Sequence, residues 1–225
     1  MASIVAFERS EMFEPWIGKS FGVPNVVGGC RLLILGESHY TKDLSKVGCT
    51  PAGFTSDVVE GLGIHGRHAF FGKLHEIVTG LRRGDQSPED KIAFWNSVAF
   101  YNYVPVLVDG RDTKEGGAGR RPTDAMFKAG AESFQSIRRE INPDAVIVCG
   151  LTLWDYLAPT LNQFEGPPRD VIYYDDGDTL YARIQHPSWA GFTTDKWYYR
   201  IHRLIEMTAE PRQAGRREVW TKVDG

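Results

Sequence analysis

Short apolar runs that stop at a glycine stand out along this chain. Residues 31–35 lead into Gly36, and residues 143–149 lead into Gly150. Such runs are typical of buried strands in a parallel sheet, because these strands are covered on both faces. Three further strands are expected from their β-branched and aromatic residues, at positions 98–106, 171–174 and 180–185.

Apolar residues at helical spacing predict helices between these strands. One helix that buries a single face is indicated by Phe70, Phe71, Leu74, Ile77, Val78 and Leu81. A second begins at Ser87 and Pro88, which are typical of a helix cap and of the first helical position. Other helices are expected at 8–19, 122–141, 151–157 and 194–208, with long loops at 41–66 and 110–121.

The alternation of strands and helices indicates the fold class. It predicts an α/β fold, as a three-layer α/β/α sandwich with a central, mostly parallel sheet. The chain has 225 residues, of which 42% are hydrophobic and 24% are charged, and this fits one compact domain. We expect that domain to span residues 1–225, with a core at 31–208 and a polar tail at 209–225.

Composition and charge argue against several classes of protein. No apolar run is long enough to cross a membrane, and the N-terminus lacks the pattern of a signal peptide. The three cysteines are odd in number and widely spaced, which argues against a disulfide framework and against a cysteine-bound metal or cluster. A cytoplasmic protein is therefore expected. The formal net charge of −3 gives no overall attraction to nucleic acid, so such binding needs a local basic patch.

Side chains that can take part in catalysis or ligand binding follow two of the expected strands. Residues 36–40 (Gly-Glu-Ser-His-Tyr) come directly after the first strand, and residues 186–188 (His-Pro-Ser) follow the last. Open α/β sheets bind ligands at the carboxyl ends of their strands. We therefore expect both turns to face one crevice.

An ordered set of motifs resembles the uracil-DNA glycosylase superfamily over residues 31–192. The turns at 36–40 and 186–188 are similar to the family's first and second motifs. Phe70-Phe71-Gly72 resembles the aromatic segment that stacks on the flipped base, and Phe100-Tyr101-Asn102 resembles the strand with the base-reading asparagine. The long helix and the strand within residues 121–150 also resemble those of the family.

This resemblance implies a DNA glycosylase, an enzyme that extrudes a base from DNA and hydrolyses its N-glycosidic bond. Phe71, or Phe70 beside it, would stack on the base. Asn102 would hydrogen-bond to the base edge, with Asn96 as the rival position. Tyr40 resembles the residue that excludes a substituent at the 5-position of the base.

The resemblance also implies which residues act on the leaving base and on DNA. Neutral His186 would donate a hydrogen bond to the base as negative charge develops on it. Ser188 would hold a DNA phosphate, and Trp189 or Phe192 would enter the base stack. Further DNA contacts are expected from two residues of the basic glycine-rich loop, Arg120 and Arg121.

Two residues depart from the family's first motif. Ser38 stands where the family often has Asp or Asn, and a serine hydroxyl is a poor base near neutral pH. We therefore expect Glu37, or else His39, to assist the attacking water or to stabilise the sugar cation, while Ser38 positions the water. His39 replaces the usual proline and makes the pocket floor more polar.

These departures favour a modified base over plain uracil. The superfamily includes phage-defence glycosylases that excise glucosylated hydroxymethylcytosine, and the long loop at 41–66 is compatible with a bulky base. Our hypothesis is a monomeric enzyme, without metal or cofactor, that excises a hypermodified cytosine from phage DNA. Excision of uracil during base excision repair is the alternative.

Three other hypotheses compete with this one. A serine esterase would use Ser38 as nucleophile and His186 as base, but Arg183 stands where that family has Asp. A DNA-binding module would keep the fold and lack the chemistry. A metal site would use His39, His65, His68 and Glu76, whose spacing only weakly matches that of metal-binding sequences.

Overall fold

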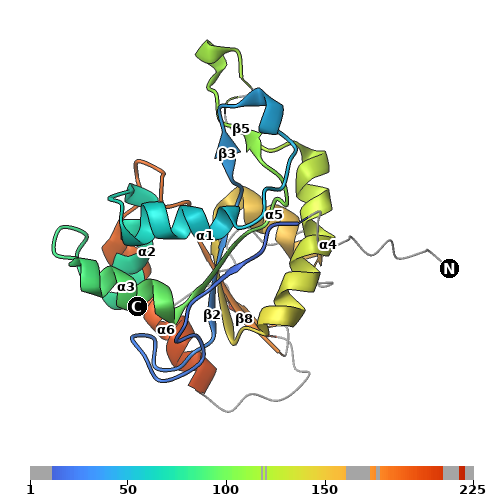
Figure 1. Cartoon of the computed structure of the whole chain (residues 1–225). Coiled ribbons are helices and arrows are strands. Elements are labelled where there is room, and N and C mark those ends of the chain that lie inside the picture. The colour runs from blue at the N-terminus through green and yellow to red at the C-terminus, as the bar shows by residue number, and fades with distance from the viewer. Residues whose placement is uncertain are drawn as a thin grey trace.

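A mixed sheet runs through the centre of the molecule (Figure 1). This computed structural model describes residues 12–117, 119, 121–160, 173–175, 178–209 and 218–220. Within these residues the sheet has seven strands, of which the four at its centre (β4, β2, β6 and β8) are parallel and the outer three pair antiparallel. In spatial order the strands are β1 (Trp16–Ile17), β4 (Ala99–Asn102), β2 (Leu32–Gly36), β6 (Ala145–Cys149), β8 (Leu180–Ile184), β7 (Tyr173–Asp175) and β9 (Glu218–Trp220).

Strand β2 shows why the central strands are continuously apolar. Leu32 and Ile34 belong to one hydrophobic cluster, whereas Leu33 and Leu35 belong to another. Successive side chains of a strand point to opposite faces of the sheet, so the two clusters lie on its two faces. All four side chains are fully buried, as expected for a strand covered on both sides.

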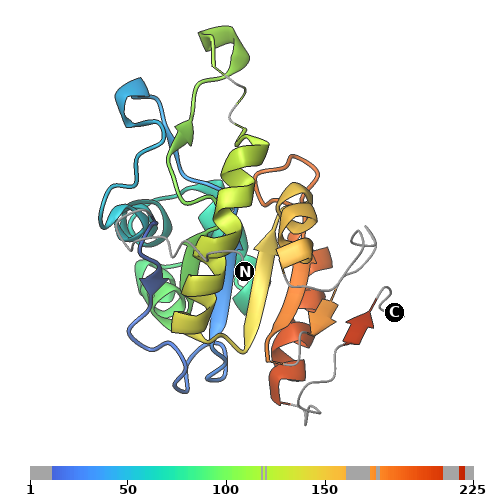
Figure 2. The same cartoon turned by 90° about the vertical axis from the view of Figure 1, so that its right-hand side faces the viewer.

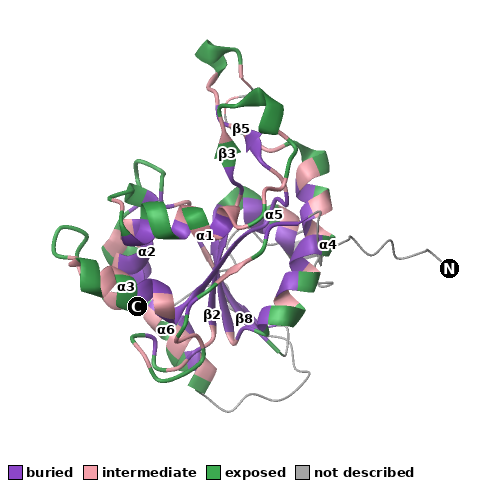
Figure 3. Ribbon diagram, viewed as in Figure 1, coloured by how far each residue is buried: buried purple, intermediate pink, exposed green. Residues whose placement is uncertain are grey.

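Helices cover both faces, and the α/β class with a mostly parallel sheet is confirmed (Figures 1 and 2). One face carries α2 (Ala69–Thr79), α3 (Pro88–Ser97) and α6 (Thr194–Ala209). The other face carries α4 (Asp124–Ile141) and α5 (Leu151–Thr160). Figure 3 shows buried residues concentrated in the strands and on the inner sides of these helices. None of the helices in the described part of the chain is long and apolar enough to span a bilayer.

A small second sheet extends beyond the carboxyl ends of the parallel strands. It pairs β3 (Tyr40–Thr41) in parallel with β5 (Val108–Asp109). Two short 3-10 helices, η2 (Leu44–Lys46) and η4 (Thr113–Glu115), lie in the same projection, at the top of Figure 1. The projection continues directly from the turn after β2.

The predicted start of α3 is confirmed in detail. The hydroxyl of Ser87 accepts a hydrogen bond from the backbone N–H of Asp90, whose carboxylate accepts one from the N–H of Ser87. Pro88 occupies the first helical position, where a missing N–H costs nothing.

The helix expected at residues 8–19 is wrong for the part that the structure describes, residues 12–19. Trp16–Ile17 is instead the edge strand β1, paired antiparallel with β4. Its position is set by long-range hydrogen bonds, because Trp16 Nε1 donates to the carbonyl of Trp95 at 2.8 Å and the N–H of Gly18 donates to Val98. Pairing with a distant strand therefore outweighs the local helical pattern.

The segments expected as loops and as a tail also hold regular structure. The stretch 41–66 contains α1 (Phe54–Val58) and η3 (Val59–Ile64), a π-helical turn that follows α1 without a break. The loop 110–121 contains η4, and the polar tail supplies β9, which pairs with β7.

The buried face of β6 gives a test of the fold. Replacement of the fully buried Ile147 by Ala should lower the free energy of unfolding by about 2–5 kcal/mol, because it leaves a cavity in a central strand. Urea denaturation measures the change. Ile92→Ala is the matched control, because Ile92 on α3 is 43% exposed and should change stability by less than about 0.5 kcal/mol. Equal losses at the two positions would contradict the placement of β6.

Candidate active site

A pocket of about 420 Å³ opens at the carboxyl ends of the parallel strands. This volume falls in the range of small-molecule binding sites. The two turns predicted to share a crevice, at 36–40 and 186–188, both contribute to its wall. The lining residues are Glu37, Ser38, His39, Tyr40, Phe54, Val58, Leu62, His68, Phe70, Phe71, Phe100, Asn102, His186 and Ser188.

Gly36 and Asn102 fit together at the base of this pocket. The two residues are partners in the parallel register of β2 and β4. A Cβ atom on Gly36 would lie only 2.0 Å from Oδ1 of Asn102, so only glycine leaves room for this amide. The glycine at position 36 therefore permits a close approach of the Asn102 side chain to the backbone of β2.

The Asn102 amide is available to a ligand. Asn102 is 5% exposed, yet its side chain makes no hydrogen bond to any residue that the structure describes. Buried amides normally find partners, so an open amide in a pocket wall is suited to hydrogen-bonding a bound molecule. The rival position, Asn96, is not in the pocket wall, and its Oδ1 accepts a hydrogen bond from the backbone of Lys19.

His186 is held in one neutral tautomer. Its Nδ1 accepts a hydrogen bond from the backbone N–H of Ser188 at 3.2 Å, so the ring proton lies on Nε2. Burial, with the nearby charge of Lys73, lowers the pKa of His186 to about 4. The imidazole is therefore neutral near pH 7 and can donate from Nε2.

Lys73 holds the turn that carries His186. Its Nζ donates to the carbonyl of Pro187 at 2.7 Å and lies 5.3 Å from the ring centre of Phe192. Lys73 thus ties helix α2 to the His-Pro-Ser turn. The sequence reasoning missed this residue, since nothing in the local pattern around Lys73 points to residue 187.

Aromatic rings form one wall of the pocket. The ring of Phe70 lies 5.2 Å from the ring of His186, at an angle of 33°. Phe71 packs more deeply, against Trp95 at 5.3 Å and Phe100 at 5.7 Å. Both phenylalanines line the pocket while contributing to the core, so packing in the core does not exclude contact with a bound molecule.

Glu37 lies half-buried at the mouth beside Tyr40. The Tyr40 hydroxyl donates to Glu37 Oε1 at 3.3 Å. Burial raises the pKa of Glu37, while the hydrogen bond from Tyr40 and the charge of Arg121 oppose that change. Burial also raises the pKa of Tyr40 to about 12, so its hydroxyl keeps its proton.

His39 is enclosed by protein. It is 4% exposed, its Nε2 lies 3.1 Å from the hydroxyl of Thr55, and its ring contacts Phe13 at 4.9 Å and Phe54 at 5.1 Å. Burial lowers the pKa of His39 to about 4, so the ring is neutral near pH 7. Ser38 differs, because its buried hydroxyl lies in the pocket wall near the hydroxyl of Tyr40 and makes no hydrogen bond of good geometry within the described residues.

The predicted DNA-contacting residues differ in their exposure. Ser188 is exposed and lines the pocket. Trp189 is 52% exposed, and its ring covers Gly191. Phe192, the other candidate for entering the base stack, is buried against Trp197 and packs in the core instead. Arg121 is exposed, and Arg120 lies outside the described residues.

One side of the pocket comes from the segment expected to be a loop. Phe54, Val58 and Leu62 lie four residues apart on α1 and η3 and line the pocket together. That spacing places them on one helical face, so it is a sequence signal that we did not use. Phe100 and His68 complete the set of lining residues that were not among the predicted site residues.

The geometry disfavours two rival sites. No three His, Cys, Asp or Glu side chains in the described ranges lie close enough to share a metal ion. For an esterase, Ser38 should be hydrogen-bonded to its base, but its hydroxyl has no partner there and the lone pair of His186 accepts from Ser188.

Neither a scan against protein-family models nor a search of curated proteins found a match for this chain.

The contact between Gly36 and Asn102 can be tested by adding one methyl group. Gly36→Ala should displace the Asn102 amide and lower the free energy of unfolding by about 1–3 kcal/mol, because the new Cβ overlaps Oδ1. Side-chain amide NMR signals and urea denaturation report the two effects. Gly61→Ala is the control, since a Cβ there meets nothing within 4 Å. An unmoved Asn102 signal in Gly36→Ala would contradict the contact.

The buried histidines give a pH prediction. Burial lowers the pKa values of His39, His75 and His186 to about 4, below the value of about 6.5 expected in the unfolded chain. Protons therefore bind the unfolded chain more tightly at these sites. Their contribution to stability is full above about pH 6.5 and is lost as the pH falls toward 4. NMR of the imidazole nitrogens should show His186 neutral at pH 6 with its proton on Nε2. A proton on Nδ1 would refute the assigned tautomer.

Proposed function

We propose that this protein is a DNA glycosylase that hydrolyses the N-glycosidic bond of an extruded pyrimidine and leaves an abasic site. The observation that carries the proposal is the shared pocket. Four separate segments, each of which resembles a motif of the uracil-DNA glycosylase superfamily, contribute residues to the wall of one cavity of about 420 Å³. We further propose that the sheet and its two helical layers form the sandwich of that superfamily.

In the proposed complex the extruded base enters between aromatic and amide groups. Phe70, with Phe71 behind it, offers a π-face for stacking. Asn102 presents one donor and one acceptor to the base edge, and both are free of protein partners within the described chain. Burial of the base in this pocket offsets part of the cost of taking it out of the stack.

In the proposed reaction the bond between C1′ of the sugar and the base nitrogen breaks, and a water oxygen forms a new bond to C1′. The base takes the electron pair and leaves as an anion, which the Nε2–H of His186 stabilises by a hydrogen bond. A neutral donor is suitable here, because its low pKa keeps the imidazole from being protonated. The base later picks up a proton from solvent.

Glu37 is the better candidate for assisting the water. It lies at the pocket mouth, where a carboxylate can stabilise the positive sugar and accept a proton from the attacking water. His39 already has its Nε2 against Thr55 and rings on two sides, so we assign it a packing role. The unpartnered Ser38 hydroxyl would position the water.

The remaining contacts in this proposal are made with DNA. Exposed Ser188 and Arg121 would bind phosphates, as would Arg120, and exposed Trp189 would enter the stack. The proposed enzyme acts as a monomer in the cytoplasm without a cofactor.

For the substrate we propose a hypermodified cytosine of phage DNA, such as glucosylated hydroxymethylcytosine. Tyr40 is 39% exposed and lies at the pocket mouth, so its side chain can rotate away from a bulky 5-substituent. Uracil is the alternative substrate, and a module that binds modified DNA without cleaving it is the alternative function.

Release of free base tests the proposal. Mass spectrometry should detect free base and abasic sites after incubation with glucosylated phage DNA. Release from uracil-containing DNA alone would identify the alternative substrate. Binding without release from either DNA would support the non-catalytic module and end the enzymatic proposal.

Matched variants test the assigned groups. Glu37→Gln should lower the single-turnover rate by about 10²–10⁴-fold, because it removes the carboxylate beside the reacting sugar. His186→Ala should lower it by about 10²–10³-fold. Glu60→Gln, at an exposed residue of η3 outside the pocket, is the control and should keep the full rate. A Glu37→Gln enzyme with the full rate would remove Glu37 from the mechanism.

A further inference from the structure

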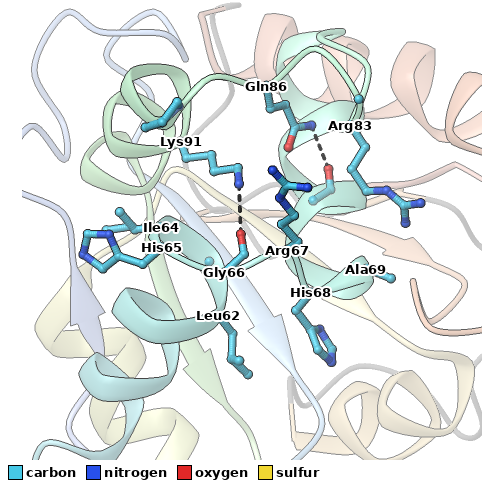
Figure 4. Close-up of a pocket in the computed structure, with 14 residues that line it drawn as sticks. Leu62, Ile64, His65, Gly66, Arg67, His68, Ala69, Arg83, Gln86 and Lys91 are labelled. Carbon is cyan, nitrogen blue, oxygen red and sulfur yellow. Dashed lines mark hydrogen bonds between the residues drawn. The ribbon is translucent and has the colours of Figure 1, made fainter.

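A second, larger cavity adjoins the candidate pocket. It has a volume of about 730 Å³ and lies between η3, the start of α2 and the segment that leads into α3 (Figure 4). The two cavities share Leu62 and His68 in their walls. In Figure 4, Arg67 lies across the middle of this cavity, with Lys91 on one side and Gln86 and Arg83 on the other.

The charged side chains that line this cavity are all basic. Arg67, Arg83 and Lys91 contribute to its wall together with His65 and His68, and no Asp or Glu is among the lining residues. None of the three cations forms an ion pair with a residue that the structure describes. The chain carries a formal net charge of −3, so this is a local concentration of positive charge.

The wall of the cavity is built from specific contacts. Lys91 Nζ donates to the carbonyl of Gly66 at 2.9 Å, and Gln86 Nε2 donates to the carbonyls of Gly72 and Leu81, each at 3.0 Å. The side chain of Arg83 lies against Gly72, where a Cβ would come within 2.7 Å of Arg83 Cγ. These contacts hold Lys91 and Arg83 against the wall of the cavity.

The backbone at the start of α2 adds to the positive potential. His68 is the N-cap residue, and its side chain caps no backbone N–H. The N–H groups of the first helical residues, 69–71, have no hydrogen-bond partner within the described chain. Free N–H groups and the helix dipole both favour an anion near this end.

We propose that this cavity binds phosphate groups. Phosphate oxygens match the guanidinium groups of Arg67 and Arg83, because two parallel N–H groups can bind two oxygens. The phosphates can come from a DNA backbone or from a free phosphate compound. The shared wall with the candidate pocket favours DNA, since a strand that delivers a nucleotide to one cavity passes the other. The proposal does not depend on glycosidic bond cleavage.

Binding of a short unmodified DNA duplex tests the DNA source. Arg83→Gln should weaken binding about three- to tenfold and reduce the slope of log affinity against log salt by about 1, because one phosphate contact is lost. Arg67→Gln should weaken DNA binding and reduce the salt slope by similar amounts, and the double variant should show the effects of both substitutions. The matched control is Arg82→Gln, because Arg82 is the exposed neighbour of Arg83, lies outside the cavity and is 3.9 Å from Asp195.

Titration with inorganic pyrophosphate tests the second source. In the wild type it should shift the backbone amide NMR signals of residues 66–71, and in the double variant it should not. If the double variant loses pyrophosphate binding but binds DNA as the wild type does, the site serves a free phosphate compound. If neither ligand depends on Arg67 and Arg83, the proposal is wrong.

Base release is measured on the same proteins with enzyme in excess. A wild-type protein that binds DNA through Arg67 and Arg83 but never releases base would overturn the glycosylase proposal and leave the phosphate site standing. Base release by a double variant whose affinities for DNA and for pyrophosphate are both unchanged would overturn the phosphate site and leave the glycosylase proposal standing.

Discussion

The parallel register of β2 and β4 is the constraint on which the candidate site depends. It places Gly36 beside Asn102, and the absence of a Cβ on Gly36 lets the amide lie directly over the backbone. The chain then leaves β2 into the turn that carries Glu37 and Ser38, and leaves β8 into the turn that carries His186. Because β8 is parallel to β2 with only β6 between them, both turns emerge at the same edge of the sheet.

Burial then decides what the side chains at this edge can do. A histidine that is surrounded by apolar rings loses its affinity for a proton, whereas a carboxylic acid in the same surroundings binds its proton more tightly. His186 and Glu37 lie in one pocket and are shifted in these opposite directions, so their charged forms are both disfavoured. The neutral imidazole accepts a hydrogen bond from the backbone N–H of Ser188. Because this donor belongs to the backbone, no side-chain entropy is lost in positioning it. The surroundings thus favour a neutral imidazole donor and a protonated carboxyl group in the wall of the same pocket.

The sequence predicts the centre of this fold better than its edges. Strands β2 and β6 are covered on both faces, and this requires continuous apolar runs that are easy to recognise. The local pattern of apolar residues predicts a helix that includes residues 16–17. The hydrogen bonds that fix Trp16 instead come from residues about eighty positions away. The stretch 41–66 reads as loop because of its glycines, although Phe54, Val58 and Leu62 repeat at helical spacing. A strand that is recognised in the sequence also fixes the position of the turn that follows it, so the residues at 36–40 could be predicted. The hydrogen bond from Lys73 to Pro187 joins residues that are distant in the sequence, so no local pattern predicts it.

Ion pairing separates two kinds of cation in this chain. Arg31 and Arg111 are paired with Asp144 and Asp109, so their charges are locally neutralised and their work is structural. Arg67 and Arg83 lie on a cavity wall without a carboxylate partner within the described residues. Leaving such charges near one another is unfavourable in the free protein, and an incoming anion relieves the repulsion. The net charge of −3 therefore does not describe the field at this cavity. Acidic residues elsewhere make the total charge negative, whereas the cations of the cavity wall make the local potential positive.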